Sequence, residues 1–404
     1  MATLRRCSIS WPMPIAASSA ETLAPGHRAL RLALVAGEAS GDLLGSLLLQ
    51  GLKARWPGLQ SVGIGGPKLV AQGLDAWWAH ERLAVFGYVD ALRRLPELLR
   101  IRRQLGDRLL RERPSVFIGI DAPDFNFGLE TRLRESGIKT VHFVCPSIWA
   151  WRGERVAKLA RAADHVLCLF PFEPALLHQH GIAATFVGHP LADAIAIEPP
   201  RAAARSALGL ANDGQVVALL PGSRRSEIVQ IAPLLLAAAV LMQRQRPGLR
   251  FVMPLVPGLR ALVEPMLAAQ GRGLAVELLD GHSHEALAAC DLTLVASGTA
   301  TLEAALFKRP MVITYRLAWL NWQRMRRMSY QPWFGLPNIL AREFLVPELI
   351  QDDATPEAMA REGLAWLDDA GRVEALVRRF IDLHHSLRQN TARKATDAIA
   401  QVIA

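Results

Sequence analysis

The chain of 404 residues is 51% hydrophobic and 21% charged, a globular composition that excludes a disordered chain and gives enough length for two domains. Its four cysteines lie far apart without a Cys-x-x-Cys pair, which argues against a disulfide framework or a zinc site and favours a reducing cytoplasm. The net charge of +9 calls for an anionic partner, and because no nucleic-acid-binding motif is present, a phosphate-bearing substrate or an anionic membrane surface is favoured over nucleic acid.

Residues 1–28 are expected to form a poorly ordered tail. Arg5 and Arg6 precede a short apolar run from Ile9 to Ala17, but two prolines interrupt that run, so a tail is favoured over a secretory signal. Nowhere else does the sequence hold an uninterrupted apolar stretch of the ~18 to 20 residues that a membrane-spanning helix needs. Any membrane contact is therefore expected to be peripheral.

Residues 29–196 alternate apolar strands with amphipathic helical stretches, which is typical of a parallel sheet wrapped by helices. After the first strand we expect a turn from Ala36 to Gly41 and then a helix from Asp42 to Arg55. The strands are expected at Arg31–Val35, Ser61–Ile64, Val116–Ile120, Lys139–Phe143 and His165–Leu169. The pattern predicts an N-terminal Rossmann-like, doubly wound α/β domain.

The same pattern restarts after Pro199 and Pro200, so residues 197–365 are predicted to form a second Rossmann-like domain. Its strands are expected at Val216–Leu220, Arg250–Pro254, Ala275–Leu278, Leu292–Ala296 and Met311–Thr314. Residues 366–404 continue a helical period and are expected to form C-terminal helices that pack back on the domains. Two such sheets facing each other predict a substrate cleft.

The loops that follow the strands are the candidate sites, because ligands of open parallel sheets bind at the carboxyl ends of the strands. The first loop, Gly37 to Asp42, opens a helix, so its amides and the Ser40 hydroxyl suit an anionic group or a sugar. A helix cap with flexible glycines is the structural alternative, since the loop matches no dinucleotide or Walker pattern. We place Gly37, Ser40 and Gly41 in the predicted acceptor site.

The second loop, Gly119 to Asn126, places two carboxylates and an amide after a buried strand. A carboxylate at a strand end is well placed to act as a general base, and Asp121 and Asp124 are both candidates. Asp124 is alternatively a cap of the following helix.

The third loop brings Ser147, Trp149 and Arg152 together after the next strand. Aromatic rings beside an arginine suit a sugar or phosphate pocket, although tryptophan is more often buried packing. With Asn126 from the second loop, these residues complete the predicted acceptor site.

Two turns of the second domain each end a strand and open a helix. The first turn supplies Ser223 and Arg224, which suit a diphosphate. The second supplies Ser297, Gly298 and Thr299 for phosphate, with Glu303 one turn along for ribose hydroxyls. Either turn alone is more often structural; together they favour a nucleotide-sugar site.

These motifs resemble those of the lipid-A-disaccharide synthases, glycosyltransferase family 19, in order and spacing from about Leu30 onward. The motifs that carry the resemblance are Leu34–Asp42, Gly119–Asn126, Pro146–Trp151, Gly188–Asp193, Leu219–Arg224, Pro254–Val256, Ala296–Glu303 and Leu336–Asn338. The resemblance implies a GT-B fold whose C-terminal domain holds the donor nucleotide, with Asn338 added to the donor site.

The resemblance also implies the reaction: UDP-2,3-diacylglucosamine and 2,3-diacylglucosamine 1-phosphate give a β-1,6-linked disaccharide and UDP, at the cytoplasmic face of the inner membrane of a Gram-negative bacterium. It further implies a homodimer that exchanges C-terminal segments. Because the donor is α-linked and the product β-linked, one in-line displacement suffices, with Asp121 as base and Asp124 and His189 as rivals. His189 is alternatively a structural histidine before Pro190.

No Asp-x-Asp element is present, so we expect catalysis without a metal or other cofactor.

Two other classes of function, and one related enzyme, remain as alternatives. A nicotinamide-dependent oxidoreductase would need a glycine fingerprint that the sequence lacks in that form. A non-catalytic nucleotide-sugar-binding protein would not need Asp121. Another UDP-sugar enzyme of the same fold, such as a muramyl-pathway transferase, would lack the preference for acylated substrates.

The segment from Leu83 to Arg113 interleaves apolar residues with arginines at helical spacing. A core-facing helix with a solvated basic face is the plain interpretation. Acylated substrates favour an interfacial helix instead, because their chains must be drawn from a bilayer. We therefore expect Val89, Leu92 and Leu95 to contact the membrane.

Overall fold

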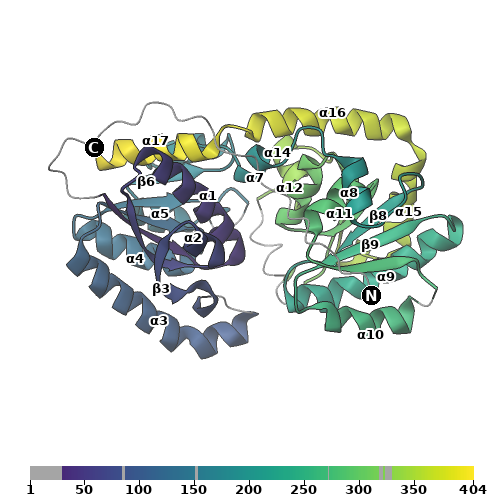
Figure 1. Ribbon diagram of the computed structural model, residues 1–404, viewed down its shortest axis with the longest axis horizontal. Coiled ribbons are helices and arrows are strands. Elements are labelled where there is room, and N and C mark those ends of the chain that lie inside the picture. The colour runs from purple at the N-terminus through teal and green to yellow at the C-terminus, as the bar shows by residue number, and fades with distance from the viewer. Residues whose placement is uncertain (1–29, 84–86, 151–152, 272, 318–321, 324–329) are drawn as a thin grey trace. The chain divides into compact units, whose positions relative to one another are not determined.

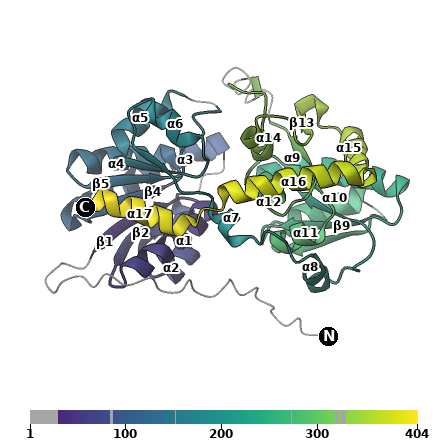
Figure 2. The ribbon, with the colours of Figure 1, turned by 90° about the horizontal axis from the view of Figure 1, so that it is seen from above.

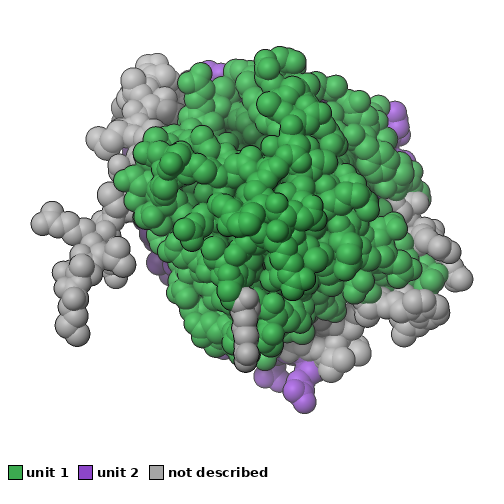
Figure 3. Space-filling model, turned by 90° about the vertical axis from the view of Figure 1, so that its right-hand side faces the viewer, with its two compact units in different colours: residues 1–11, 194–385 green, residues 12–193, 386–404 purple. Residues whose placement is uncertain are grey.

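The computed structural model describes residues 30–404 except 84–86, 151–152, 272, 318–321 and 324–329 (Figure 1). The chain forms two compact units, coloured separately in Figure 3. Of the described residues, one unit contains 30–193 together with Ser386–Ala404, and the other contains Ala194–His385. The last helix therefore belongs to the N-terminal unit, whereas the helix before it stays with the C-terminal one.

The N-terminal unit is built on a seven-stranded parallel sheet with the order β3-β2-β1-β4-β5-β6-β7. Its strands are β1 (Arg31–Ala36), β2 (Gln60–Gly65), β3 (Leu74–Ala79), β4 (Val116–Ile120), β5 (Lys139–Phe143), β6 (His165–Cys168) and β7 (Ala184–Phe186). All five residues of β4 are buried, as expected of a central parallel strand covered on both faces.

Helices cover this sheet in two groups. Its helices are α1 (Ala39–Arg55), α2 (Pro67–Ala71), α3 (Gly87–Glu112), α4 (Pro123–Glu135), α5 (Arg155–Ala162), α6 (Glu173–His178), α7 (Pro190–Ala194) and α17 (Thr391–Ile403). α1 packs against α2 and α17, while α4 packs against α3 and α5. The predicted doubly wound architecture is confirmed.

The C-terminal unit has a six-stranded parallel sheet with the order β10-β9-β8-β11-β12-β13. Its strands are β8 (Val216–Leu220), β9 (Arg250–Leu255), β10 (Val276–Asp280), β11 (Leu292–Ala296), β12 (Met311–Tyr315) and β13 (Glu348–Ile350). Its helices are α8 (Arg201–Ala207), α9 (Arg225–Gln245), α10 (Arg260–Gln270), α11 (Ser283–Ala289), α12 (Thr299–Leu306), α14 (Leu336–Ala341), α15 (Pro356–Asp368) and α16 (Ala370–Leu387). α9 packs with α10 and α15, and α11 packs with α8 and α12.

All ten predicted strands are present, but three edge strands were missed. β3 and β7 flank the first sheet and β13 flanks the second. Edge strands are covered on fewer sides, and no residue of β7 or β13 is fully buried, so their apolar signal is weak. The expected turn from Ala36 to Gly41 was wrong at its end, because α1 already begins at Ala39.

α17 returns to the N-terminal unit and lies along α1, as Figure 2 shows. Its first amides are capped by the Asp193 carboxylate, which accepts hydrogen bonds from Asn390 N (2.9 Å) and Thr391 N (2.6 Å). A Cβ on Gly51 of α1 would lie only 2.9 Å from Ala392 Cβ, so the two helices pack closely because residue 51 is glycine. The Gly188–Asp193 motif therefore anchors the C-terminal helix.

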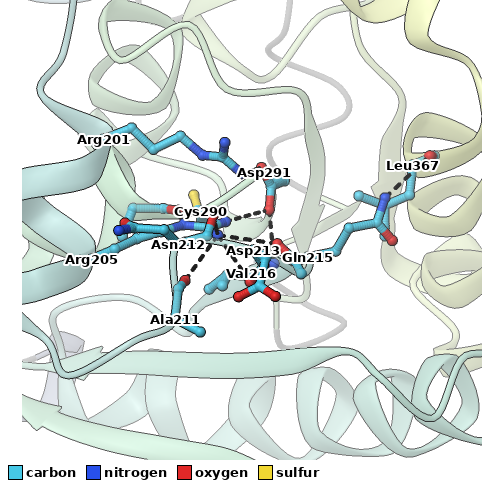
Figure 4. Close-up of polar contacts among 12 residues, drawn as sticks. Arg201, Arg205, Ala211, Asn212, Asp213, Gln215, Val216, Cys290, Asp291 and Leu367 are labelled. Carbon is cyan, nitrogen blue, oxygen red and sulfur yellow. Dashed lines mark hydrogen bonds and ion pairs between the residues drawn. The ribbon is translucent and has the colours of Figure 1, made fainter.

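A buried arginine joins the amino ends of β8 and β11 in the C-terminal unit (Figure 4). Arg205, 1% exposed, donates to Asp291 Oδ2 (2.8 Å), which also accepts from Val216 N (2.8 Å). Its guanidinium further donates to the carbonyl oxygens of residues 211, 212, 213, 214 and 289. This network lies at the opposite end of the strands from the predicted nucleotide turns, so it stabilises the sheet.

By length and composition, one helix in the described part of the chain is able to cross a membrane, namely α9. No uninterrupted apolar stretch of spanning length was expected here, because Gln230 and Gln243 bound the apolar run Ile231–Met242. Eight side chains of α9 are buried in the C-terminal unit, among them Ile228, Leu235 and Met242. α9 is thus a core helix of that unit.

Candidate active site

Asp121 follows β4 in a turn whose backbone is unusual. Asp121 and Ala122 have φ angles of 51° and 45°, in the left-handed region that residues with a Cβ rarely adopt. The Asp121 N–H donates to Phe143 O (2.9 Å), and Asn126 Nδ2 donates to Asp121 O (2.8 Å). The Asp121 side chain is half-buried, and among the described residues none hydrogen-bonds to its carboxylate. Its oxygens can therefore accept a proton from a substrate.

Asp124 is engaged elsewhere. Its side chain is 86% exposed, and both of its oxygens accept from Arg155 Nη2 at 2.8 Å. The interpretation of Asp124 as a helix cap is wrong, because Ala122 is the N-cap residue of α4 and Asp124 lies within the first turn. There its negative charge still interacts favourably with the positive end of the helix dipole.

His189, the other rival base, is a buried residue at the start of α7. Its Nδ1 accepts a hydrogen bond from Leu191 N (3.2 Å), and its backbone N–H donates to Leu387 O (2.9 Å) in the chain leading to α17. Burial lowers the pKa of His189 from 6.5 to about 4. His189 is therefore neutral at physiological pH, and its contacts belong to the structural arrangement around α17.

The lowered pKa of His189 predicts a pH-dependent stability. The folded chain binds this proton less tightly than the unfolded chain, so the stabilisation is complete above pH 6.5 and is lost as the pH falls towards 4. Urea unfolding at pH 7.5, 6.0 and 5.0 should show a shallower decline for His189→Gln than for the wild type. His180→Gln, at an exposed position, is the control, and equal slopes for wild type and His189→Gln would contradict the expectation.

The loop from Gly37 to Asp42 lies beside the Asp121 turn. A Cβ on Gly37 would be 3.1 Å from Ala122 Cβ, and one on Gly41 would be 3.6 Å from Ile120 O. Ser40 is exposed in the first turn of α1. The structure thus brings Gly37, Ser40 and Gly41 to the carboxyl ends of β1 and β4, close to Asp121.

Asp42 has a function that the sequence did not predict. Its buried carboxylate accepts hydrogen bonds from the amides of Gly66 (2.8 Å), Lys68 (2.9 Å) and Leu69 (3.1 Å) at the start of α2. Asp42 therefore caps a neighbouring helix that begins 25 residues later, at Pro67, and so fixes the loop after β2.

Trp149 is held by a carboxyl group that no sequence pattern predicted. Its Nε1 donates to Glu173 Oε1 (3.0 Å), and its ring packs edge-on against Phe172 with centroids 5.4 Å apart. Burial raises the pKa of Glu173 to about 8. Ser147 is exposed in the same loop, whereas Arg152 lies outside the described residues.

In the C-terminal unit, the turn before α9 binds a carboxylate of its own chain. The amides of Ser223 and Arg224 donate to Glu227 Oε2 at 2.9 and 3.1 Å, and Arg224 Nη1 lies 3.1 Å from Glu227 Oε1. The Arg224 side chain is 52% exposed. This turn thus presents amides and a cation to an anion, and in this structure the Glu227 carboxylate takes that position.

The turn before α12 is joined to a second segment. Gly298, the N-cap of α12, has a φ of 154°, and Thr299 beside it is exposed. Ser297 Oγ donates to Phe334 O (3.2 Å), and Thr301 Oγ1 accepts from Leu336 N (3.3 Å). These contacts hold the loop before α14 beside the predicted phosphate turn.

Asn338 and Glu348 fix that loop from inside the unit. Asn338 is fully buried; its Nδ2 donates to Glu348 Oε1 (2.8 Å) and its Oδ1 accepts from Val346 N (3.1 Å). Glu348 also accepts from the amides of Phe334 and Gly335, both at 2.8 Å, while burial raises the pKa of Glu348. Glu348 stands on the edge strand β13, which the sequence pattern did not reveal, so its role was missed.

Glu303 faces a histidine of the neighbouring helix. Its Oε1 lies 3.5 Å from His284 Nε2, and the His284 ring packs 5.3 Å from that of Phe307. Glu303 is 20% exposed, so its carboxylate remains open to a ligand. Within the described residues, no three His, Cys, Asp or Glu side chains cluster as metal ligands do.

Comparison with known proteins identifies the family. A family model described as lipid-A-disaccharide synthetase matches residues 32–403. The chain is 60% identical to the lipid-A-disaccharide synthase of Verminephrobacter eiseniae over 380 residues, covering 93% of this chain and 98% of that protein. The enzyme of the same name from Albidiferax ferrireducens is 57% identical over 379 residues, which cover 93% and 97% of the two chains.

Solved structures show the fold. The UDP-GlcNAc 2-epimerase of Neisseria meningitidis, bound to UDP-GlcNAc, has a TM-score of 0.64 at 11% identity and covers 92% of this chain and 99% of its own. The calicheamicin glycosyltransferase CalG4 has a TM-score of 0.56 at 16% identity, with 93% and 99% covered. These likenesses confirm the predicted GT-B fold class. Because the family model matches residues 32–403 and relatives at 57 to 60% identity match over nearly their whole length, the chain belongs to the lipid-A-disaccharide synthetase family.

Proposed function

We propose that the chain is an inverting glycosyltransferase that condenses UDP-2,3-diacylglucosamine with 2,3-diacylglucosamine 1-phosphate, giving the β-1,6-linked disaccharide 1-phosphate and UDP. The observation that carries this proposal is the half-buried Asp121 carboxylate at the end of β4, in a chain whose relatives bear the name of that synthase. Gly37, Ser40 and Gly41 lie at the same sheet edge and supply the acceptor site.

Asp121 acts as the general base in this scheme. It takes the proton of the acceptor 6-hydroxyl while the oxygen attacks the anomeric carbon from the face opposite UDP. A single displacement of this kind converts the α-linked donor into a β-linked product. Ser147, Trp149 and Arg152 complete the acceptor side of the site. Asn126, which was expected there, is fully buried, so it supports the site only through its hydrogen bond to Asp121 O.

The leaving diphosphate is held by the C-terminal unit. Arg224 and the amides at the starts of α9 and α12 supply positive potential, with Ser223, Ser297, Gly298 and Thr299 around the phosphates. Because the Glu227 carboxylate now accepts from the Ser223 and Arg224 amides, it must give way when the diphosphate arrives. Glu303 binds the ribose hydroxyls, and Asn338 with Glu348 holds the loop beside them.

This arrangement predicts metal-independent catalysis. EDTA should leave turnover unchanged, whereas Arg224→Ala should weaken UDP binding about tenfold or more, because a charge-assisted contact to phosphate is lost. Glu303→Ala should also weaken UDP binding. Isothermal titration with UDP measures both variants, and Arg225→Ala, at the exposed neighbouring position, is the matched control. Loss of activity in EDTA that a divalent ion restores would contradict the scheme.

We further propose that α3 brings the chain to the cytoplasmic face of the inner membrane. Leu95 and Leu99 are 46% and 44% exposed, and Arg100 and Arg103 are exposed on the same helix. The side chains of Val89 and Leu92 lie outside the described residues. An apolar surface flanked by arginines suits an interface with anionic headgroups.

Replacing Val89, Leu92 and Leu95 with serine should reduce binding to vesicles of anionic phospholipid and make the chain easier to extract in soluble form. Flotation with and without added salt measures this. Val229→Ser, at a 47% exposed position on α9, is the control. Vesicle binding that changes with neither salt nor the triple substitution would place the membrane contact elsewhere.

A homodimer that exchanges its C-terminal segments remains part of the proposal, and α17 is the segment concerned.

The proposed reaction is tested by incubating purified protein with both acylated substrates and measuring UDP and the tetraacyl disaccharide by mass spectrometry. UDP-GlcNAc without acyl chains serves as the control donor and should react poorly. No product from the two acylated substrates would overturn the proposal.

A further inference from the structure

A buried polar cluster lies beneath the turn that carries Asp121. Glu130 Oε1, on α4, is 2.7 Å from His142 Nδ1, on β5, and both side chains are 0% exposed. Asn126, one helical turn before Glu130, is also fully buried. The proposed mechanism assigns no chemical step to Glu130 or His142.

Strand β4 makes room for this cluster at Gly119. Gly119 is the register partner of His142 in the pairing of β4 with β5. A Cβ on Gly119 would lie 2.0 Å from Glu130 Oε1 and 3.1 Å from Asn126 Cβ. Glu130 can therefore reach His142 only because the residue two positions before Asp121 has no side chain.

The cluster is connected to Asp121 through the backbone. Asn126 Nδ2 donates to Asp121 O (2.8 Å), and the Asp121 N–H donates to Phe143 O, next to His142 on β5 (2.9 Å). Asp121 and Ala122 both adopt the left-handed conformation, which persists in residues with a Cβ only where the surroundings hold it. The cluster provides those surroundings from α4 and β5 together.

Stability alone does not account for the cluster. Glu130 Oε2, His142 Nε2 and Asn126 Oδ1 are buried and have no hydrogen-bond partner among the described residues. Buried polar atoms without partners are unfavourable, and apolar side chains of similar volume would stabilise such a position at least as well. The advantage of the polar residues therefore lies in the geometry that they impose.

We infer that Asn126, Glu130 and His142 are positioning residues that hold the Asp121 carboxylate in line with the acceptor hydroxyl. The Glu130–His142 pair fixes α4 against β5, and Asn126, on the same helix, fixes the carbonyl of Asp121. They act through Asp121. The inference thus rests on the proposed role of Asp121 as the base.

The test measures kcat, the KM of each substrate and the UDP dissociation constant for Asn126→Ala, Asn126→Asp and Glu130→Gln. A base displaced by a fraction of an ångström transfers the proton less well, so kcat should fall about tenfold to a hundredfold. KM and UDP affinity should remain near the wild-type values. Asn126→Asp should be slower than Asn126→Ala, because it sets a carboxylate against the Asp121 carbonyl.

Asp164→Asn is the matched control. Asp164 accepts hydrogen bonds from Nε of Arg134 (2.9 Å), which lies on α4 as Asn126 does, and from Thr140 N (2.8 Å). These contacts lie at the amino end of β5, away from Asp121. The Asp164→Asn substitution should lower the urea midpoint without changing kcat. An equal fall of kcat in this control would show a general loss of structure and would overturn the inference.

The remaining outcomes separate the inference from the proposed function. If Asp121→Asn is inactive while both Asn126 variants keep the wild-type kcat, the positioning role is refuted and the base stands. If Asp121→Asn keeps its turnover, the base itself is refuted, and the inference falls with it. Should Glu130→Gln fail to fold, the two Asn126 variants decide, because they leave the Glu130–His142 contact in place.

Discussion

Replacing Asp121 with asparagine is expected to lower kcat by about a hundredfold or more, because general-base catalysis contributes ~10² to 10⁴ to the rate. The asparagine keeps the size of the side chain but cannot accept the proton. UDP affinity should be nearly unchanged, since the residues proposed to bind UDP belong to the C-terminal unit. Initial rates with both acylated substrates and titration with UDP measure the two quantities.

Asp124→Asn is the control for that experiment. Asp124 is 86% exposed and paired with Arg155, and an exposed ion pair contributes only about 0 to 1 kcal/mol to stability. Its kcat should therefore stay near the wild-type value. Near-wild-type turnover of Asp121→Asn, or a large loss in Asp124→Asn, would remove Asp121 from the role of base.

Arg205→Ala is expected to destabilise the C-terminal unit by about 3 to 5 kcal/mol, because it leaves the Asp291 carboxylate without its buried partner. The carbonyl oxygens that Arg205 joins would also lose their donor. Urea unfolding followed by tryptophan fluorescence measures the change, and Trp366 provides a buried probe within this unit.

Arg201→Ala is the matched control, since Arg201 pairs with the other oxygen of Asp291 but is 44% exposed. Its loss should cost less than about 1 kcal/mol. Equal effects of the two substitutions would mean that burial of Arg205 does not decide the energy of this network.

The nine interior strands of the two sheets and the edge strand β10 were predictable, because apolar runs such as Val216–Leu220 are typical of buried parallel strands. The candidate loops followed from them, since ligands bind where such strands end. The order of the strands and the edge strands β3, β7 and β13 were not predictable from the same signal. These three edge strands bury too little apolar surface to produce it.

Long-range polar contacts account for most of what was missed. The Asp42 carboxylate caps α2 from another helix, Glu173 holds Trp149, and Glu348 organises the loop before α14. Each partner lies 10 or more residues away along the chain, so no local pattern reveals the pair. Gly119 shows the same limit, because the side chain that excludes a Cβ there is Glu130 on the following helix.

The linkage of the disaccharide product tests the central claim most directly, namely that one displacement with Asp121 as base joins the two sugars. The product made by the purified chain from UDP-2,3-diacylglucosamine and 2,3-diacylglucosamine 1-phosphate can be analysed by proton NMR. Inversion at the anomeric carbon predicts a β linkage to the 6-oxygen of the acceptor, formed together with one equivalent of UDP, and formed at least about a hundredfold more slowly by Asp121→Asn. An α linkage, or release of UDP with the sugar transferred only to water, would contradict the account.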